Sequence, residues 1–280
     1  MTALKTIAIL GCLLIAASAL SQSAEDQLVS QFVKRTEDKR TQKLSWASVS
    51  FQMDRINRHN DYNSFATYES ANFTNANLSW LGQAKSFGID MGIVYSRRLA
   101  VSVGGEYWLK LGDNLSGDFE YNSSGLVTTV TDPASQISVW GVTTGLQYYP
   151  FAHPTSSGGT GRLSLRFGGT VGYYHASWNV WNEYQSLNLT TSLPEGDNIS
   201  FQDSGPGFSL VIGADYPLRW KSLAVGAEFG YLYLNFDNIA WYNSSEQEIV
   251  ASSNGTPKGR VDLNLSGIRA KIELKRFFSW

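Results

Sequence analysis

The chain has 280 residues, which is enough for one sizeable domain or two small ones. Its formal charge of −2, from 22 Lys and Arg against 24 Asp and Glu, argues against a nucleic-acid binder. Charged residues make up only 16% of the chain, while 14 Tyr, 14 Phe, 9 Trp and 26 Gly favour many short strands and polar loops over helices.

The first residues have the features of an export signal. Lys5 precedes an apolar stretch over 7–17, and small residues from Ser18 to Ala24 provide a cleavage region. That stretch is shorter than the ~20 helical residues needed to span a bilayer. We therefore expect a cleaved signal peptide over 1–23, with the cut within 19–24, then a polar lead-in over 24–43 and a barrel domain over 44–280. The single cysteine, Cys12, lies in the signal, so we expect no disulfide in the exported domain.

Beyond the lead-in, the hydrophobic pattern has a period of two. Along 86–96, for example, the odd positions are apolar and the even positions are mostly small or polar. Such alternation is typical of strands that have one apolar face. It predicts eight strands, over 46–54, 86–96, 99–111, 138–149, 162–176, 207–217, 222–235 and 262–280.

Short and long connections alternate between these strands. The long ones cover roughly 55–85, 112–136, 177–206 and 236–260. An even number of strands with one rim of tight turns and one rim of long loops is typical of a transmembrane β-barrel. The interior of an eight-stranded barrel is just wide enough for side chains to fill it, so the many bulky apolar residues must face lipid. A soluble ligand-binding barrel, with the apolar face inside, is the alternative.

We therefore predict an all-β fold, an eight-stranded antiparallel up-and-down transmembrane β-barrel with short periplasmic turns and long extracellular loops. Aromatic residues at both ends of the strands, Trp46 among them, agree with belts at the two bilayer interfaces.

With this pattern the chain resembles the small outer-membrane β-barrel proteins of Gram-negative bacteria, of the OmpA/OmpX transmembrane type. The resemblance implies an outer-membrane location and contact with outer-membrane lipid and lipopolysaccharide. It also implies recognition by the barrel-insertion machinery through a C-terminal signal, which Glu273, Phe278 and Trp280 match. Lys275 stands where that signal usually has glycine. Because the chain ends with the last strand, we expect no periplasmic domain.

Charged residues on the small-residue face are expected inside the barrel. By parity the interior holds five acidic and five basic residues, Asp90, Glu106, Asp215, Glu228 and Glu273 against Lys110, Arg166, Arg269, Lys271 and Lys275. We expect ion pairs between Arg166 and Asp215 and between Glu228 and Arg269. Because isolated charges are costly in such a space, this polar network predicts a plugged barrel. An aqueous pore is the alternative reading.

One short pattern suggests chemistry on the barrel wall. His175 and Ser177 are two residues apart, so a strand would place them on the same lipid-side face. Outer-membrane lipid A deacylases use a similar His and Ser pair, and lipid-directed hydrolysis is therefore one alternative function.

The long loops repeat a Tyr-Asn-Ser motif that begins at Tyr62, Tyr121 and Tyr242, and they also carry Trp80, Trp181 and Trp241. Such residues pack loops on one another, and recognition surfaces use them too. Phosphate-binding loops, metal-ligand clusters and basic stripes are missing from the sequence, so we expect no cofactor, no metal and no nucleic-acid partner. We predict a non-enzymatic protein whose loops meet an extracellular ligand in recognition, adhesion or surface protection. The alternatives are a narrow pore for small solutes and a lipid A-directed hydrolase.

Overall fold

The computed structural model describes residues 44–96, 98–151, 163–188, 198–218, 222–239, 241–242, 248–253, 256–259 and 261–279. The expected signal peptide, the lead-in and Trp280 lie outside these residues.

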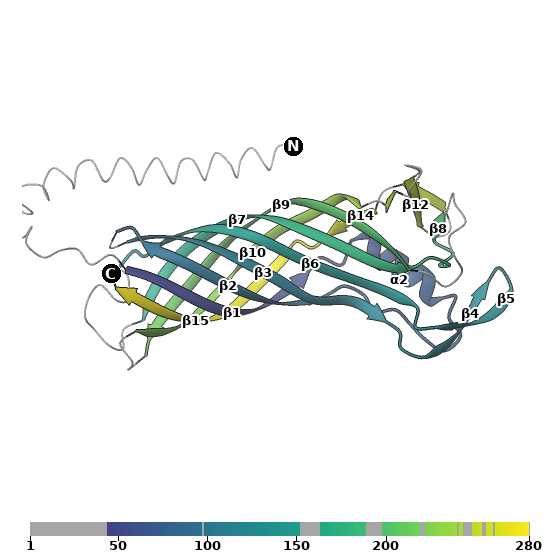
Figure 1. Cartoon of the computed structure of the whole chain (residues 1–280), viewed down its shortest axis with the longest axis horizontal. Helices are drawn as coiled ribbons and strands as arrows, with labels where there is room; N and C mark the ends of the chain where they lie inside the picture. Colours follow the sequence, from purple (N-terminus) through teal and green to yellow (C-terminus); the bar gives the residue numbers. More distant parts are fainter. Residues whose placement is uncertain are drawn as a thin grey trace, which may run out of the picture. The chain divides into compact units, whose positions relative to one another are not determined.

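The protein is a closed antiparallel β-barrel of eight strands (Figure 1). Each strand pairs with the next along the chain, and the last pairs with the first, from Leu44 opposite Ser279 to Ile56 opposite Gly267. The barrel strands are β1 (Leu44–Ile56), β2 (Ala84–Val94), β3 (Leu99–Asn114), β6 (Ala134–Tyr148), β7 (Ser164–Trp181), β9 (Asn198–Pro217), β10 (Leu223–Ile239) and β15 (Gly267–Ser279). The predicted fold class is confirmed.

The strands follow the predicted alternation, but several are longer than predicted. β9 begins at Asn198 rather than near 207, and β7 continues to Trp181. Their extra residues extend the sheet toward the long-loop rim, past the region in which apolar side chains face lipid. Ladder hydrogen bonds continue there, with Val180 opposite Ile199.

The outward face of the barrel is apolar on all eight strands. Large exposed side chains there include Val49, Ile89, Val103, Val142, Phe167, Ile212, Phe229 and Ile272, one from each strand. A soluble protein rarely exposes an apolar surface that is continuous around the molecule, whereas a membrane barrel buries it in lipid. The barrel therefore spans a membrane with its apolar face outward, as predicted.

Short connections join strands at one rim, where the barrel begins at Leu44 and ends at Ser279. At the other rim the long loops contain α2 (Asp61–Ser70), β4 (Asp118–Ser123), β5 (Leu126–Thr131), β8 (Leu187–Asn188), β11 (Trp241–Tyr242), β12 (Glu248–Ser253), β13 (Thr256–Gly259) and β14 (Val261–Asn264) (Figure 1). Asn60 caps α2 by accepting a hydrogen bond from the Asn63 backbone N–H at 2.9 Å. Among the described residues, no helix is long and apolar enough to cross a lipid bilayer.

A hydrophobic core extends from the long-loop end of the barrel into these loops. We call the loops together the extracellular cap. Phe65 of α2 lies edge-on to Trp178 of β7, with ring centroids 4.9 Å apart, and to Tyr184 at 5.1 Å. Tyr121 of β4 packs edge-on against Trp181 at 5.1 Å. The inward face of the barrel thus changes along its length, from polar near mid-depth to apolar beneath the cap.

Candidate functional site

The middle of the barrel is filled by charged side chains, and the first group surrounds Arg166 on β7. This guanidinium is only 1% exposed. It lies 3.4 Å from Asp215 and 3.0 Å from Glu228, and it also contacts Glu273. Lys275 adds a second cation, 3.2 Å from Asp215 and 3.3 Å from Glu273. A buried cation is therefore held by several carboxylates at once, as the cost of desolvation requires.

Arg269 on β15 forms the second group. Its guanidinium donates to Asp54 at 2.7 and 3.1 Å and to Glu106 at 3.0 and 2.6 Å, so both carboxylates are bound in bidentate fashion. Asp54 is its register partner on β1. Ser86 also donates to Glu106, at 3.2 Å. The guanidinium lies 5.9 Å from the centre of the Trp108 ring.

Lys271 lies between the two groups on the same inward stripe of β15. Its ammonium is 2.9 Å from Asp90 and 3.7 Å from both Glu228 and Glu273. A cavity of about 30 Å³ remains beside it, bordered by Asp90, Glu228 and Arg269. That space has room for roughly one or two water molecules between the charged side chains.

Apolar side chains close the barrel below this polar layer. Trp46 points inward, is buried against Ala224 and Phe277, and has the Lys275 ammonium 4.8 Å from its ring centre. The prediction that Trp46 belongs to an interfacial belt is wrong, because it shares the inward parity of Ser48 and Ser50.

The structure corrects the predicted position of Lys110. This residue is exposed on the outside of the barrel and takes no part in the interior network. The ladder between β3 and β6 shifts register between Trp108 and Leu111, where two β3 residues oppose a single β6 residue. Such a bulge reverses which face each later side chain occupies. Leu111 is consequently buried, and Lys110 is turned outward.

Of the two predicted ion pairs, Arg166 with Asp215 is present at 3.4 Å, and Glu228 with Arg269 is wrong. Arg269 binds Asp54 and Glu106 rather than Glu228, while Glu228 faces Arg166 and Lys271. Asp54 is a member of the network that was not predicted, although it lies on the polar face of its strand. With Asp54 inside and Lys110 outside, the described interior holds six carboxylates and four cations: Asp54, Asp90, Glu106, Asp215, Glu228 and Glu273 with Arg166, Arg269, Lys271 and Lys275. The predicted balance of five and five is therefore wrong.

A buried carboxylate holds the extracellular cap together. Glu69, at the end of α2, accepts hydrogen bonds from the Tyr121 hydroxyl at 2.5 Å, Asn72 at 3.1 Å and the Ser186 backbone N–H at 2.7 Å. These partners come from three different long loops. Burial, and then the adjacent Glu69 carboxylate, raise the pKa of Tyr121 above its usual range, so the phenol remains a donor at neutral pH.

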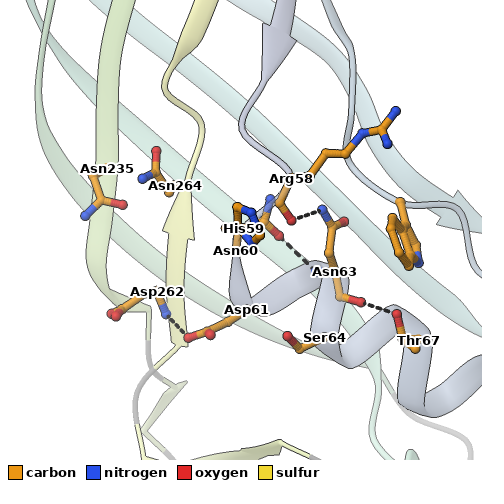
Figure 2. Close-up of a pocket in the computed structure, with 11 residues that line it drawn as sticks. Arg58, His59, Asn60, Asp61, Asn63, Ser64, Thr67, Asn235, Asp262 and Asn264 are labelled. Carbon is orange, nitrogen blue, oxygen red and sulfur yellow. Dashed lines mark hydrogen bonds between the residues drawn. The ribbon is translucent and has the colours of Figure 1, made fainter.

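An open cleft lies on one side of the cap, and we call it the α2 cleft (Figure 2). Its volume is about 780 Å³. The lining residues come from the segment after β1, from α2, from the loop before β2, and from β10 and β14: Arg58, His59, Asn60, Asp61, Asn63, Ser64, Thr67, Trp80, Asn235, Asp262 and Asn264. The Asp262 backbone N–H donates to Asp61 at 2.9 Å and ties β14 to the start of α2.

On the outer wall, His175 and Ser177 do not contact each other in the described structure. His175 Nδ1 is 2.8 Å from the Ser204 hydroxyl on β9, and Ser177 is 2.8 Å from the Ser200 hydroxyl. A serine bonded to a histidine is part of a nucleophilic site, but a third group normally orients the histidine. Within the described part of the chain, no carboxylate contacts His175.

The predicted insertion signal is divided between the two faces of β15. Glu273 points inward to Arg166 and Lys275, and Phe278 points outward. In the part of the chain that the structure describes, no cluster of three or more His, Cys, Asp or Glu side chains is placed to hold a metal ion.

The closed barrel and its apolar exterior give the chain the fold of the small outer-membrane β-barrel proteins. No protein-family model matches the sequence, and a search of curated proteins finds no match. Among solved structures, the outer membrane protein OprG from Pseudomonas aeruginosa is 12% identical with a TM-score of 0.46, over 85% of this chain and 96% of that one. Ail, the attachment invasion locus protein of Yersinia pestis, was solved in complex with a heparin analogue. It is 9% identical with a TM-score of 0.41, over 85% of this chain and 100% of that one. The outer membrane protease OmpT from Escherichia coli is 11% identical with a TM-score of 0.34, over 86% and 98%.

Proposed function

We propose that this protein is a non-enzymatic outer-membrane protein whose plugged barrel carries a folded extracellular cap for recognition. The observation that carries the proposal is that three successive layers of side chains fill the described interior. Trp46 and Phe277 close the short-turn end, the ion pairs fill the middle, and aromatic side chains fill the end beneath the cap. A barrel packed in this way serves as a rigid support, and the ligand contacts fall to the loops it holds.

The described part of the cap supports a binding role because its loops pack on one another. Tyr62 and Tyr121 are buried and pack the loops on one another, which is the packing role expected for them rather than the alternative contact surface. Trp80, Leu126 and Val127 remain exposed on the cap. Rigid loops lose little conformational entropy on binding, which favours affinity.

The membrane partners in this proposal are outer-membrane lipid and lipopolysaccharide around the apolar wall, and the barrel-insertion machinery. The machinery would read the outward side of β15, where Phe278 is exposed, together with Trp280. Glu273 would contribute afterwards, within the folded interior.

Two measurements test this function. The purified full chain, folded into planar bilayers, should give no conductance steps, because ion-paired and apolar side chains fill the described interior. Gram-negative cells that display the protein should adhere to at least one of a panel of surfaces, which includes matrix proteins, epithelial cells and polysaccharides. Adhesion should fall when Trp80, Leu126 and Val127 are changed together to Ser. Reproducible single-channel steps, or the absence of adhesion to every surface, would overturn the proposal.

A further inference from the structure

The lining of the α2 cleft has an unusual composition for a pocket of this size. Most binding pockets are predominantly apolar, with a few polar groups that orient the ligand. Here ten lining side chains are polar or charged, and the remaining one is Trp80, which is 57% exposed. No aliphatic side chain is among the lining residues. The accessible lining thus combines polar groups with the carbon atoms of Trp80 and of the polar residues themselves, and no aliphatic side chain contributes to it.

The walls of the cleft are held rigidly by their own hydrogen bonds. The Asn63 amide donates to the Arg58 backbone carbonyl at 2.8 Å (Figure 2). It also donates to the Leu81 carbonyl at 3.1 Å, and its oxygen accepts from the Leu81 N–H at 2.7 Å. Thr67 donates to the Asn63 carbonyl at 2.8 Å. These bonds fix the relative positions of Arg58, α2 and the segment that leads to Trp80, so the cleft is preorganised.

The groups that face the opening suit a ligand with many hydroxyl groups. Arg58 presents a planar fork of donors, and the Ser64 hydroxyl can donate and accept. The Asn264 amide oxygen already accepts from the Ser266 N–H at 2.9 Å, so Asn264 offers its NH2 group as a donor. Neighbouring hydroxyls of a sugar ring match such planar groups because each hydroxyl both donates and accepts. The C–H face of the same ring packs against an indole, which supplies a large rigid apolar surface.

The charges in the cleft exclude a polyanion. Asp61 and Asp262 lie in the lining with a single guanidinium, that of Arg58. Phosphate or sulfate groups would meet two carboxylates, and like charges placed together oppose binding. The volume of about 780 Å³ is within the range that accommodates a drug-sized ligand.

From this chemistry, we propose that the α2 cleft binds a neutral oligosaccharide, with a sugar ring stacked on Trp80 and its hydroxyls bound by Arg58 and Asn264. This inference deepens the proposed recognition function and rests on it. The glycan could come from another cell or from the uncharged outer saccharides of the lipopolysaccharide in the same membrane, since both present the same hydroxyl-rich surface.

The test uses the full chain, folded in detergent and applied to arrayed glycans. One set contains neutral oligosaccharides, a second contains sulfated ones, and a third contains oligosaccharides released from the host's own lipopolysaccharide. Titration calorimetry then measures the affinity for the best ligand. We expect Trp80→Ala to weaken binding at least tenfold and Asn264→Ala to weaken it severalfold. Thr129→Ala, a change at an exposed position of the β4–β5 hairpin outside the cleft, is the matched control and should leave the affinity unchanged.

The outcomes distinguish a failure of the oligosaccharide inference from a failure of the proposed recognition function. Trp80-dependent binding of neutral glycans supports the inference, and the set that contains the best ligand identifies its source. Preference for sulfated glycans, or binding that Trp80→Ala leaves intact, overturns it. If no glycan binds but cells still adhere to a protein surface, the saccharide ligand is wrong and the recognition function stands. If neither occurs, both fail.

Discussion

Removal of the Arg269 side chain should strongly destabilise the barrel. In Arg269→Met, Asp54 and Glu106 lose four charge-assisted hydrogen bonds of 2.6–3.1 Å and are left facing each other in a buried site. Breaking a buried ion pair by removing one partner costs about 3–5 kcal/mol, because the remaining charge is uncompensated. We therefore expect the free energy of unfolding to fall by about that amount.

The assay is urea unfolding of the full chain in lipid vesicles, followed by tryptophan fluorescence. Arg276→Met is the matched control, since Arg276 lies on the same strand but is exposed, and it should change stability by less than about 1 kcal/mol. The triple variant Arg269→Met, Asp54→Asn, Glu106→Gln removes all three charges and should recover most of the loss. Equal losses for Arg269→Met and Arg276→Met, or a triple variant no more stable than the single one, would refute this reasoning.

Three further predictions follow from the cap, the interior glycines and the outer wall. Glu69→Gln removes the charged acceptor shared by Tyr121, Asn72 and Ser186, and should weaken the cap by about 1.5–3 kcal/mol. Hydrogen exchange at Ser186 should then accelerate while unboiled gel migration stays the same, whereas Glu120→Gln on the exposed face of β4 should change neither. A Cβ at Gly226 would lie 2.6 Å from Asp215 and 2.7 Å from Glu273, so Gly226→Val should reduce the fast-migrating folded band on unboiled gels. Gly105→Val, whose Cβ would meet nothing closer than 3.8 Å, should preserve that band. His175→Ala and Ser204→Ala should leave the lipid A composition of an overexpressing strain unchanged, and a difference from wild type would instead favour hydrolysis.

The sequence was a good guide to the barrel wall because that wall is built from a local pattern. Side chains alternate between two faces of every strand, so Ile89 and Asp90 take opposite faces wherever the strand is placed. Parity likewise assigns Arg166, Arg269 and Lys271 to one face without reference to other strands. Parity gives the wrong face for Lys110, because a bulge in β3 shifts the alternation of side chains by one residue. The hydrophobic pattern of the sequence does not reveal that bulge.

Pairing within the interior depended on the register of strands far apart in the chain. Asp54 and Arg269 are separated by 215 positions, and they meet only because β15 closes the barrel against β1. The polar face of β1 was a usable signal for Asp54, since it continues the stripe of Ser48, Ser50 and Gln52. The choice of Glu106 as the second partner had no such local signal.

In the cap, too, the sequence did not reveal contacts between segments that are far apart in the chain. Composition indicated that tyrosines would pack the loops together, and Tyr62 and Tyr121 are indeed buried. The polar cleft beside α2 was not foreseen, because its lining comes from segments as distant as Arg58 and Asn264.

By itself, then, the sequence determined the strand alternation, the outward apolar face and the chemical character of the interior, because these depend on residues two positions apart. Only the tertiary structure decided which charges pair, where the barrel is sealed and where a ligand could enter. Those features arise from contacts that exist after the sheet has closed and the loops have packed on one another, as with Glu69 and Ser186, 117 positions apart.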